Sequence, residues 1–304
     1  MLGNGLNRVY GGNSWTDLIG KIAVRKDFPT KLTCPYPLQA VLATNDHVKK
    51  AMVDFRNDFF GSTSAELREQ IQKLLALNFD DVLTTNYSYE IEASATSKDT
   101  LSENYLKKTC QNVVDGEKAE PKYLIHTCQA IPFNGHTNRI WHIHGEARKP
   151  NSMILGQYYY ATLLYKMVDF AQKRRDNYQY HQKENTPQTI RSWIDSFILG
   201  DVYILGFGMD FSEIDLWWLL NRKKRERANH GCVYYYSPGG EGFDEKEELL
   251  KQLGVQVIHC GIPTPEGTDE EKNLQFRKFY QHAINDIKER MINTKTILEG
   301  IKNG

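Results

Sequence analysis

The sequence predicts an α/β fold, and two observations lead to this prediction. First, short apolar runs alternate with segments of helical periodicity in the second half of the chain, as in βαβ units. We expect strands at 202–206, 232–236 and 255–259, and helices at 212–228, 244–253 and 268–292. Second, several apolar runs end in glycine or small polar residues, as at the ligand-binding edge of parallel sheets. The prediction is therefore a Rossmann-like parallel sheet with helices on both faces and helical insertions.

The first third of the chain is predicted to be mainly helical. Ser14 and Asp17 have the spacing of a helix start, so we expect a helix from there to about Ala23. Apolar residues recur at helical spacing over 38–60 and 64–77, and the next strand is expected at 81–84.

Met1 and Leu2 are too few residues for a full strand before Gly3. Either the first strand is vestigial or the natural N-terminus lies upstream of Met1, and the sequence leaves both possibilities open.

The middle third is less regular. Residues 93–121 are polar and weakly patterned, which indicates an insertion that is loop-rich or partly helical. We expect short strands at 123–125 and 139–143, and helices at 157–182 and 187–199. No repeat or Gly/Ser linker divides the chain, so we expect one domain over residues 1–304, with the segments at 157–199 as helical insertions.

Composition excludes several classes of protein. Basic and acidic residues balance at 38 each, so no overall field attracts nucleic acid or an anionic membrane. The longest apolar runs are too short to span a bilayer. The five cysteines form an odd set without a Cys-x-x-Cys pair, which favours reduced thiols in the cytoplasm and argues against a four-cysteine zinc module.

Four stretches are predicted to meet at the carboxyl edge of the sheet. They are Gly3-Asn4-Gly5, Thr84-Thr85-Asn86, His142-Ile143-His144-Gly145 and Gly206-Phe207-Gly208. Together they suit a dinucleotide cleft that contains an imidazole, because glycines let the backbone approach a pyrophosphate. Simpler interpretations stay open for two of them: Gly3-Asn4-Gly5 as an ordinary turn, and Asn86 as the N-cap of a helix that begins near Tyr87.

His142 and His144 face the same way on a strand because they alternate about Ile143. We expect His144, at the strand end, to reach a ligand, and His142 to be a core or supporting histidine. A His-x-His pair could begin a zinc site, but no third ligand stands at a telling distance. His126 and His259 are candidates only by default, and we expect no metal.

Three further features of the sequence have structural interpretations. Ser212 and Asp215 match a capping box, with a ribose contact by Asp215 as a secondary possibility. The basic run 222–227 is expected to be a solvated helix end rather than a nucleic-acid contact. Trp217-Trp218 and the tyrosines at 158–160 give more aromatic surface than one core face needs, which predicts a homo-oligomer, with simple core packing as the open alternative.

These residues resemble the sirtuin-like superfamily, in its bacterial antiphage-defence branch. Members of that superfamily carry a Gly-x-Gly loop, a Thr-Asn edge, a His-Gly edge and a Gly-rich fourth edge, which correspond here to Gly3–Gly5, Thr85-Asn86, His144-Gly145 and Gly206–Gly208. The likeness spans residues 1 to about 260. The stretches 142–145 and 153–156 also resemble the related abortive-infection H-type proteins.

The resemblance implies that Asn86 and His144 are catalytic. It further implies that NAD binds to residues at the four strand edges and to a polar residue near Ser237. Two departures stand out. Ser88 replaces the acidic residue that usually follows the family's asparagine, which puts one ribose or nicotinamide contact in doubt. The zinc-binding cysteine module of the deacylating members is absent, which argues against a protein deacylase.

The implied activity is hydrolysis of NAD to nicotinamide and ADP-ribose by an antiviral abortive-infection effector. Nicotinamide leaves as a neutral group, so the reaction does not need the carboxylate pair of ordinary glycosidases. Asn86 would hold the water or the ribose. His144, with an ordinary pKa of about 6.5, would act as a base.

A non-catalytic NAD or ADP-ribose sensor, or a partner-binding module, is the alternative, and a protein deacylase is least favoured. NAD is thus expected as substrate and not as a resident cofactor. An activating defence-system partner or phage component is also expected, since no sensor domain is recognisable. We expect neither membrane association nor direct nucleic-acid binding.

Overall fold

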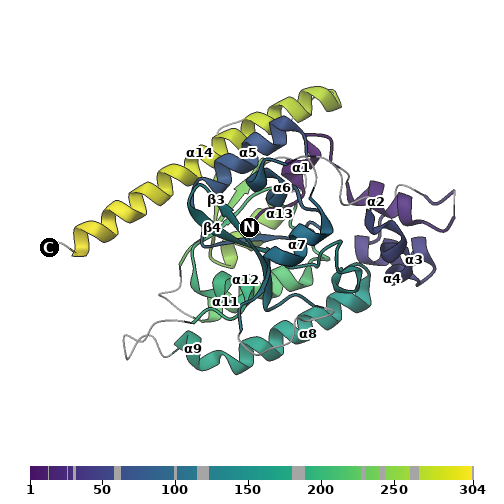
Figure 1. Cartoon of the computed structure of the whole chain (residues 1–304), viewed down its shortest axis with the longest axis horizontal. Coiled ribbons are helices and arrows are strands. Elements are labelled where there is room, and N and C mark those ends of the chain that lie inside the picture. Colours follow the sequence, from purple (N-terminus) through teal and green to yellow (C-terminus); the bar gives the residue numbers. More distant parts are fainter. Residues whose placement is uncertain are drawn as a thin grey trace.

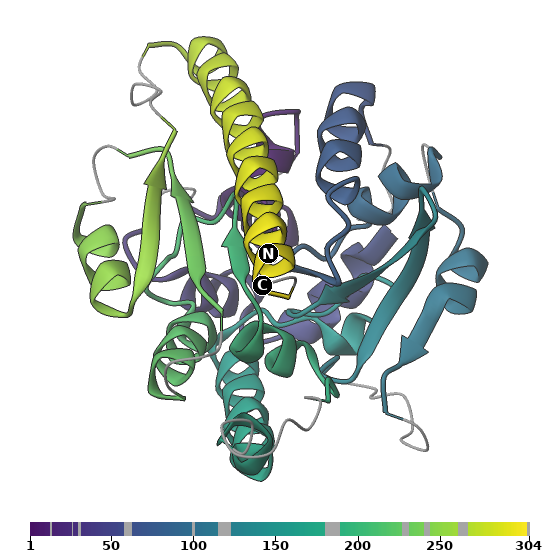
Figure 2. The same cartoon turned by 90° about the vertical axis from the view of Figure 1, so that its left-hand side faces the viewer.

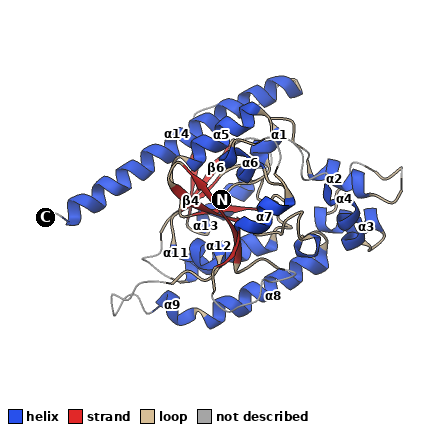
Figure 3. Ribbon diagram, viewed as in Figure 1, coloured by secondary structure: helices blue, strands red, loops and turns tan. Residues whose placement is uncertain are grey.

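A computed structural model describes most of the chain, and strands lie at its centre with helices around them (Figure 3). The described residues are 1–12, 14–25, 27–29, 32–57, 63–98, 101–114, 123–179, 189–226, 231–239, 244–260 and 267–302. Parts of the predicted insertion at 93–121 and of the predicted helices at 38–60, 157–182, 187–199 and 212–228 lie outside these residues.

The helices follow the predicted order along the chain (Figure 1). The first third contains α1 (Gly5–Arg8), α2 (Trp15–Ile22), α3 (Tyr36–Thr44), α4 (Val48–Phe55) and α5 (Ala65–Leu75). The middle contains α6 (Glu90–Thr96), α7 (Glu103–Thr109), the 3-10 helix η2 (Pro150–Ser152), α8 (Gln157–Lys173), α9 (Arg175–Gln179) and α11 (Trp193–Leu199). The last third contains α12 (Ile214–Arg225), α13 (Asp244–Gln252) and α14 (Asp269–Lys302).

The predicted start of α2 is confirmed. The Ser14 hydroxyl accepts a hydrogen bond from the backbone N–H of Asp17, and the Asp17 carboxylate accepts one from the backbone N–H of Ser14. This reciprocal capping satisfies two backbone donors that a helix start otherwise leaves without partners.

The strands form two groups. β1 (Asp81–Thr84), β2 (Cys110–Asn112), β3 (Thr127–Phe133) and β4 (His136–His142) pair in the order β1-β4-β3-β2. β5 (Val202–Ile204), β6 (Val233–Ser237) and β7 (Val255–His259) pair in the order β5-β6-β7. The pairings β1–β4, β5–β6 and β6–β7 are parallel, whereas β2–β3 and β3–β4 are antiparallel.

Leu2 joins the two groups. It forms single parallel bridges to Thr84 at the end of β1 and to Leu205 just after β5. The backbone N–H of Leu2 donates to the carbonyl of Leu83 at 2.7 Å, and the N–H of Leu205 donates to the carbonyl of Met1 at 3.0 Å. The chain start therefore occupies a strand position one residue long between β1 and β5.

The antiparallel hairpin β3–β4 corrects the prediction of an entirely parallel sheet. Its two-residue turn is Asn134-Gly135, and both residues have positive φ angles, 48° and 79°. That geometry suits the twist of a hairpin, and Asn-Gly is its strongest short-range signal. The strand predicted at 123–125 is wrong, because these residues form no strand and β3 begins at Thr127.

Alternate residues of the strands pack into two different hydrophobic clusters. Val202 and Ile204 belong to one cluster with residues of α8, α11 and α12. Tyr203 and Leu205 belong to a second cluster with residues of α5 and α14. Figure 2 shows α14 (yellow) running across the middle of the molecule, with β6 and β7 (green) to one side and β3 and β4 (teal) to the other.

The basic run at 222–227 was predicted to be a solvated surface, and this is wrong at one position. The Lys223 side chain is buried and donates hydrogen bonds to the backbone carbonyls of Phe197, Ile198 and Gly200, at 2.7–3.1 Å. These carbonyls end α11 and have no partners inside that helix. Lys223 thus attaches α12 to the end of α11, and burial lowers its pKa to about 8.

Candidate functional site

The predicted site residues do come together at one edge of the sheet. The strands β1 and β5 run parallel to Leu2, so their carboxyl ends point the same way. Gly3, Thr85, Asn86, His144 and Gly206 follow such strand ends, and Ser237 is the last residue of β6. Residues of all four predicted stretches thus lie at this edge of the sheet.

The first two glycines bring the chain start against the loop after β5. The N–H groups of Gly3 and Gly5 donate to the carbonyls of Leu205 and Gly206, both at 2.9 Å. A Cβ atom on Gly3 would lie 2.4 Å from the Gly206 carbonyl oxygen, and one on Gly5 would lie 2.8 Å from it. Both positions therefore require glycine for this contact, whatever ligand binds.

Two details limit an anion site at the chain start. Asn4 precedes α1, and its side chain makes no capping hydrogen bond. Because α1 has only four residues, its dipole offers little to a phosphate. Gly208 differs from Gly3 and Gly5, since a Cβ atom there would meet nothing within 4 Å.

Asn86 is held through its backbone. Its N–H donates to the Thr84 hydroxyl at 3.1 Å, and its carbonyl accepts a hydrogen bond from Nδ1 of His142 at 2.7 Å. The alternative interpretation as an N-cap is wrong, because α6 begins only at Glu90. Within the described part of the chain, the Asn86 side-chain amide makes no hydrogen bond and so remains available to a ligand.

His142 supports Asn86. Its Nε2 lies 2.8 Å from Oε1 of Glu92, and both residues are buried. Because a backbone carbonyl and a carboxylate both accept, both ring nitrogens donate and the ring is an imidazolium. Burial lowers the pKa of His142, but Glu92, Glu146 and the Asn86 carbonyl raise it more, to about 9.

His144 forms a second histidine–carboxylate pair. Its Nε2 lies 2.7 Å from Oδ2 of Asp215, and neither side chain is exposed. Burial lowers the pKa of His144, but the charge and hydrogen bond of Asp215, and then the charge of Glu213, raise it to above its ordinary value. The Tyr160 ring packs edge to face against the His144 imidazole, with the two ring centroids 5.3 Å apart. His144 lies deeper than the solvent-accessible strand end that we predicted.

Asp215 does not serve the capping box predicted for it. The helix α12 begins at Ile214 after Glu213, without a side-chain cap hydrogen bond. The Ser212 hydroxyl instead donates to the Asp210 carboxylate at 2.6 Å, and Asp215 accepts from His144. The capping prediction is wrong because it considers only local partners, whereas the pairing with His144 depends on the tertiary fold.

Three polar atoms of this cluster are buried without hydrogen-bond partners among the described residues. They are Nδ1 of His144, Oδ1 of Asp215 and Oε2 of Glu213. Burial raises the pKa of Glu213, the charge of His144 lowers it, and the charges of Asp215 and Asp210 raise it, and the net result is about 7. Buried polar atoms in native proteins nearly always have partners. Three unpaired atoms on adjoining residues therefore indicate a place where a polar ligand or water completes the structure.

Ser88 and Ser237 are both engaged with acidic residues. The Ser88 hydroxyl donates to Oε2 of Glu90 at 2.6 Å, so a carboxyl group stands two residues beyond the position where the resemblance expects one. The Ser237 hydroxyl donates to Glu247 and accepts from the backbone N–H of Gly239. Both hydrogen bonds of the Ser237 hydroxyl are therefore made within the protein, and a ligand contact would have to replace one of them.

Phe207 contributes to the packing of the same edge. It is buried, and its ring occupies the space that a Cβ atom on Gly3 would need. Its carbonyl accepts a hydrogen bond from the Tyr235 hydroxyl at 2.8 Å.

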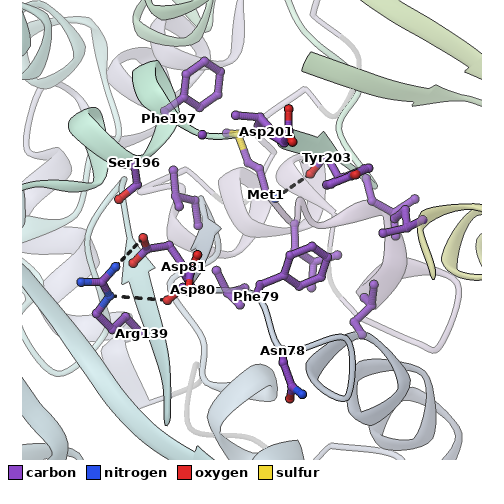
Figure 4. A pocket seen from close by; sticks show the side chains of 18 of the residues that line it. Met1, Asn78, Phe79, Asp80, Asp81, Arg139, Ser196, Phe197, Asp201 and Tyr203 are labelled. Atoms are coloured by element: carbon purple, nitrogen blue, oxygen red, sulfur yellow. Dashed lines mark hydrogen bonds and ion pairs between the residues drawn. The ribbon is translucent and has the colours of Figure 1, made fainter. Parts of the chain in front are cut away.

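A cavity of about 810 Å³ lies at the opposite edge of the sheet, near the starts of β1 and β5 (Figure 4). Its polar lining includes the Asp81–Arg139 ion pair, 2.8 Å between Nη2 and Oδ2, while the Met1 ammonium group donates to the Tyr203 carbonyl at 2.6 Å. Most of the remaining lining is aliphatic. No predicted site residue lines this cavity. We therefore locate the candidate site at the carboxyl edge.

The described residues contain no group of three His, Cys, Asp or Glu side chains placed to hold a metal ion. The two histidines considered by default have protein partners. Nδ1 of His126 bonds to the Arg191 carbonyl, and Nε2 of His259 to Glu247. No described helix combines the length and the apolar character needed to cross a bilayer.

Neither a comparison with protein-family models nor one with curated proteins gives a match for this chain.

Proposed function

We propose that this protein hydrolyses NAD to nicotinamide and ADP-ribose. The observation that carries the proposal is the pairing of His144 with Asp215 at the sheet edge that also presents Asn86, with Nδ1 of His144 left without a partner. A histidine whose one nitrogen donates to a carboxylate can use its other nitrogen on substrate, and the carboxylate stabilises the imidazolium that forms.

We further propose that the fold is Rossmann-like, with helices on both faces of one sheet. With Leu2 as a strand position, the parallel strands run in the order β4-β1-Leu2-β5-β6-β7. This is the strand order of dinucleotide-binding sheets, which bind ligand where the order reverses. Here the reversal falls at Leu2, directly before Gly3. The two hydrophobic clusters fed by alternate strand residues support helices on both faces.

The chemistry needs little beyond these groups. The bond between nicotinamide and ribose breaks with its electron pair going to the nitrogen of the cationic ring, so no proton has to be supplied. The Asn86 amide would orient the ribose or the attacking water. His144 would contact a ribose hydroxyl or that water through Nδ1.

We propose that the biological role is antiviral defence through NAD depletion in the cytoplasm, on the strength of the resemblance described above. Activation by a defence-system partner or a phage component, which would raise NAD cleavage above the basal activity of the purified chain, belongs to the same proposal. So does a homo-oligomer, for which the exposed rings of Tyr158 and Tyr165 on α8 are the support. Trp217 and Trp218 pack against the core and add less exposed surface than expected. Light scattering at several concentrations would contradict the oligomer if only a 35.1 kDa particle appeared.

The test is incubation of the purified chain with NAD at several protein concentrations, with chromatography of nicotinamide and ADP-ribose. We expect both products in equal amounts from the wild type and neither from Asn86→Ala. Binding of ADP-ribose by calorimetry without any NAD cleavage would replace the proposal by the sensor alternative. Nicotinamide release only in the presence of an acetylated peptide would indicate a deacylase.

A further inference from the structure

Glu213 is a carboxyl group of the site that the resemblance does not assign. It is the residue before α12, and its side chain makes no capping hydrogen bond. The residue is half-buried and its Oε2 atom is buried without a partner. Its backbone N–H donates to the Asp210 carbonyl at 3.0 Å, which fixes the chain at this point. The backbone of Glu213 is thus held in place, whereas its carboxyl group stabilises no other part of the described structure.

The groups that face Glu213 come from five segments. Burial, and next the charge of Glu213, raise the pKa of Tyr87 and Tyr160 well above the ordinary value. Tyr87 follows β1 and Tyr160 lies on α8. The remaining titratable neighbours are His144 after β4, Asp215 on α12 and Asp210 in the loop after β5. Glu213 therefore faces the same interior as His144, between the ends of β1, β4 and β5.

Charge balance separates the roles of the two acidic residues. Asp215 is bonded to His144, so that pair is neutral overall when both groups are ionised. Glu213 has no hydrogen-bonded cation. An ionised Glu213 would therefore supply the net negative charge that favours the cationic nicotinamide ring and the oxocarbenium-like sugar.

Resting on the NAD hydrolysis proposed above, we propose that Glu213 is a catalytic residue that takes the proton from the attacking water. As the C1′–N bond breaks and its electron pair goes to nicotinamide, the water oxygen bonds to C1′ and one water proton moves to a carboxylate oxygen of Glu213. The products are neutral nicotinamide, ADP-ribose and a protonated Glu213, which later releases its proton to solvent. His144, held by Asp215, then contacts a ribose hydroxyl.

The proposal makes activity depend on the ionisation of Glu213. Its pKa of about 7 means that kcat/KM should rise as pH increases through about 7, since the base must be ionised in the free enzyme. Burial lowers the pKa of His144, but Asp215 raises it above the ordinary value.

The experiment compares wild type with Glu213→Gln, Glu213→Ala and Glu289→Gln, the last an exposed acid on α14 that controls for the loss of one charge. We expect Glu213→Gln to lose activity by a factor on the order of 100 to 10,000, to lack the rise near pH 7 and still to bind ADP-ribose in calorimetry. Added sodium formate should restore part of the activity of Glu213→Ala, because formate replaces the missing carboxylate. Glu289→Gln should match wild type.

The outcomes separate the two proposals. Nicotinamide release by Glu213→Gln within twofold of wild type, with the same pH profile, would overturn the role of Glu213 and leave NAD hydrolysis standing. An absence of release by the wild type at every protein concentration would overturn NAD hydrolysis and the role of Glu213 with it. If Glu213→Gln does not fold, formate rescue of Glu213→Ala decides, and a folded Glu213→Ala that formate cannot restore would count against the proposal.

Discussion

Nε2 of His144 lies 2.7 Å from Oδ2 of Asp215, across 71 residues of sequence and with both side chains fully buried. A carboxylate in such a place loses most of its hydration, and its partner has to compensate for that loss. The pair is costly to break, since an ionised Asp215 alone would be a buried charge without a counterion. Its two outer atoms, Nδ1 and Oδ1, have no partners among the described residues. That combination is typical of a site completed by a ligand.

Replacing Asn86 by alanine should abolish NAD cleavage while leaving the fold intact. The Asn86 amide makes no hydrogen bond to the described protein, and alanine keeps the backbone bonds to Thr84 and His142. We therefore expect the free energy of unfolding to change by about 1 kcal/mol or less. Urea unfolding and nicotinamide release measure the two effects. An active Asn86→Ala protein would remove Asn86 from the catalytic role that the resemblance gives it.

Alanine at Gly3 should destabilise the protein, whereas alanine at Gly208 should not. At Gly3 the added Cβ would lie 2.4 Å from the carbonyl oxygen of Gly206, so the two backbones must separate, at a cost of about 1–3 kcal/mol. At Gly208 nothing lies within 4 Å, so stability should stay near that of wild type. Thermal unfolding of the two variants checks the prediction.

The Gly208→Ala variant also tests where the ligand binds. If the backbone at Gly208 approaches the dinucleotide, Gly208→Ala should weaken ADP-ribose binding in calorimetry without loss of stability. Unchanged binding by Gly208→Ala would move the ligand away from this loop.

Sequence periodicity was sufficient to predict the helices and the parallel strands of the second half, because each of them repeats a local pattern. The β3–β4 hairpin also has a local signal in Asn134-Gly135, but the short strands expected at 123–125 and 139–143 do not include it. The antiparallel pairing then follows from a two-residue turn.

A local sequence pattern could not predict which charged groups are buried or which of them pair. Lys223 stands in a run of basic residues, yet the fold places it under the end of α11. Asp215 has the spacing of a capping residue, yet His144 approaches it from a strand 71 residues earlier. The sequence could mark Asn86 and His144 because strand ends carry them. It could not indicate Asp215 or Glu213 as their neighbours, since that depends on how α12 lies against β4.

The His142–Glu92 pair should make stability depend on pH in the alkaline range. The pKa of His142 is about 9 in the folded protein and exceeds the value of about 6.5 in the unfolded chain. The stabilisation is therefore fully present below pH 6.5 and disappears as pH rises through about 9. The difference corresponds to roughly 3 kcal/mol. Urea unfolding of the wild type at pH 6.5 and pH 9.5 should show this loss.

The double variant His142→Gln, Glu92→Gln is the matched control, because it removes both charges and keeps side chains able to form hydrogen bonds. Lys223 acts in the opposite direction, since its folded pKa of about 8 lies below that of a free lysine. It is present in both proteins, so the difference between their pH profiles isolates His142. Equal slopes for the two proteins would show that His142 is neutral in the folded state.

Replacing Asp215 by asparagine should lower activity through His144 rather than through the fold. Asparagine keeps the size and one accepting oxygen but removes the charge that offsets the burial of the imidazole. Without that charge, burial should bring the pKa of His144 below its value in the wild type. Nicotinamide release should fall on the order of 100-fold or more, and imidazole NMR signals should show the His144 ring titrating at lower pH.

A purely structural role for Asp215 would give a different pattern. It would reduce the amount of folded protein but leave the His144 titration of the remaining folded molecules unchanged. Asp169→Asn, an exposed change of the same charge on α8, should leave both the titration and the activity as in wild type. Activity loss together with a shifted His144 titration in Asp215→Asn alone would therefore identify Asp215 as the residue that positions the imidazole. An unshifted titration would assign the loss of activity to packing instead.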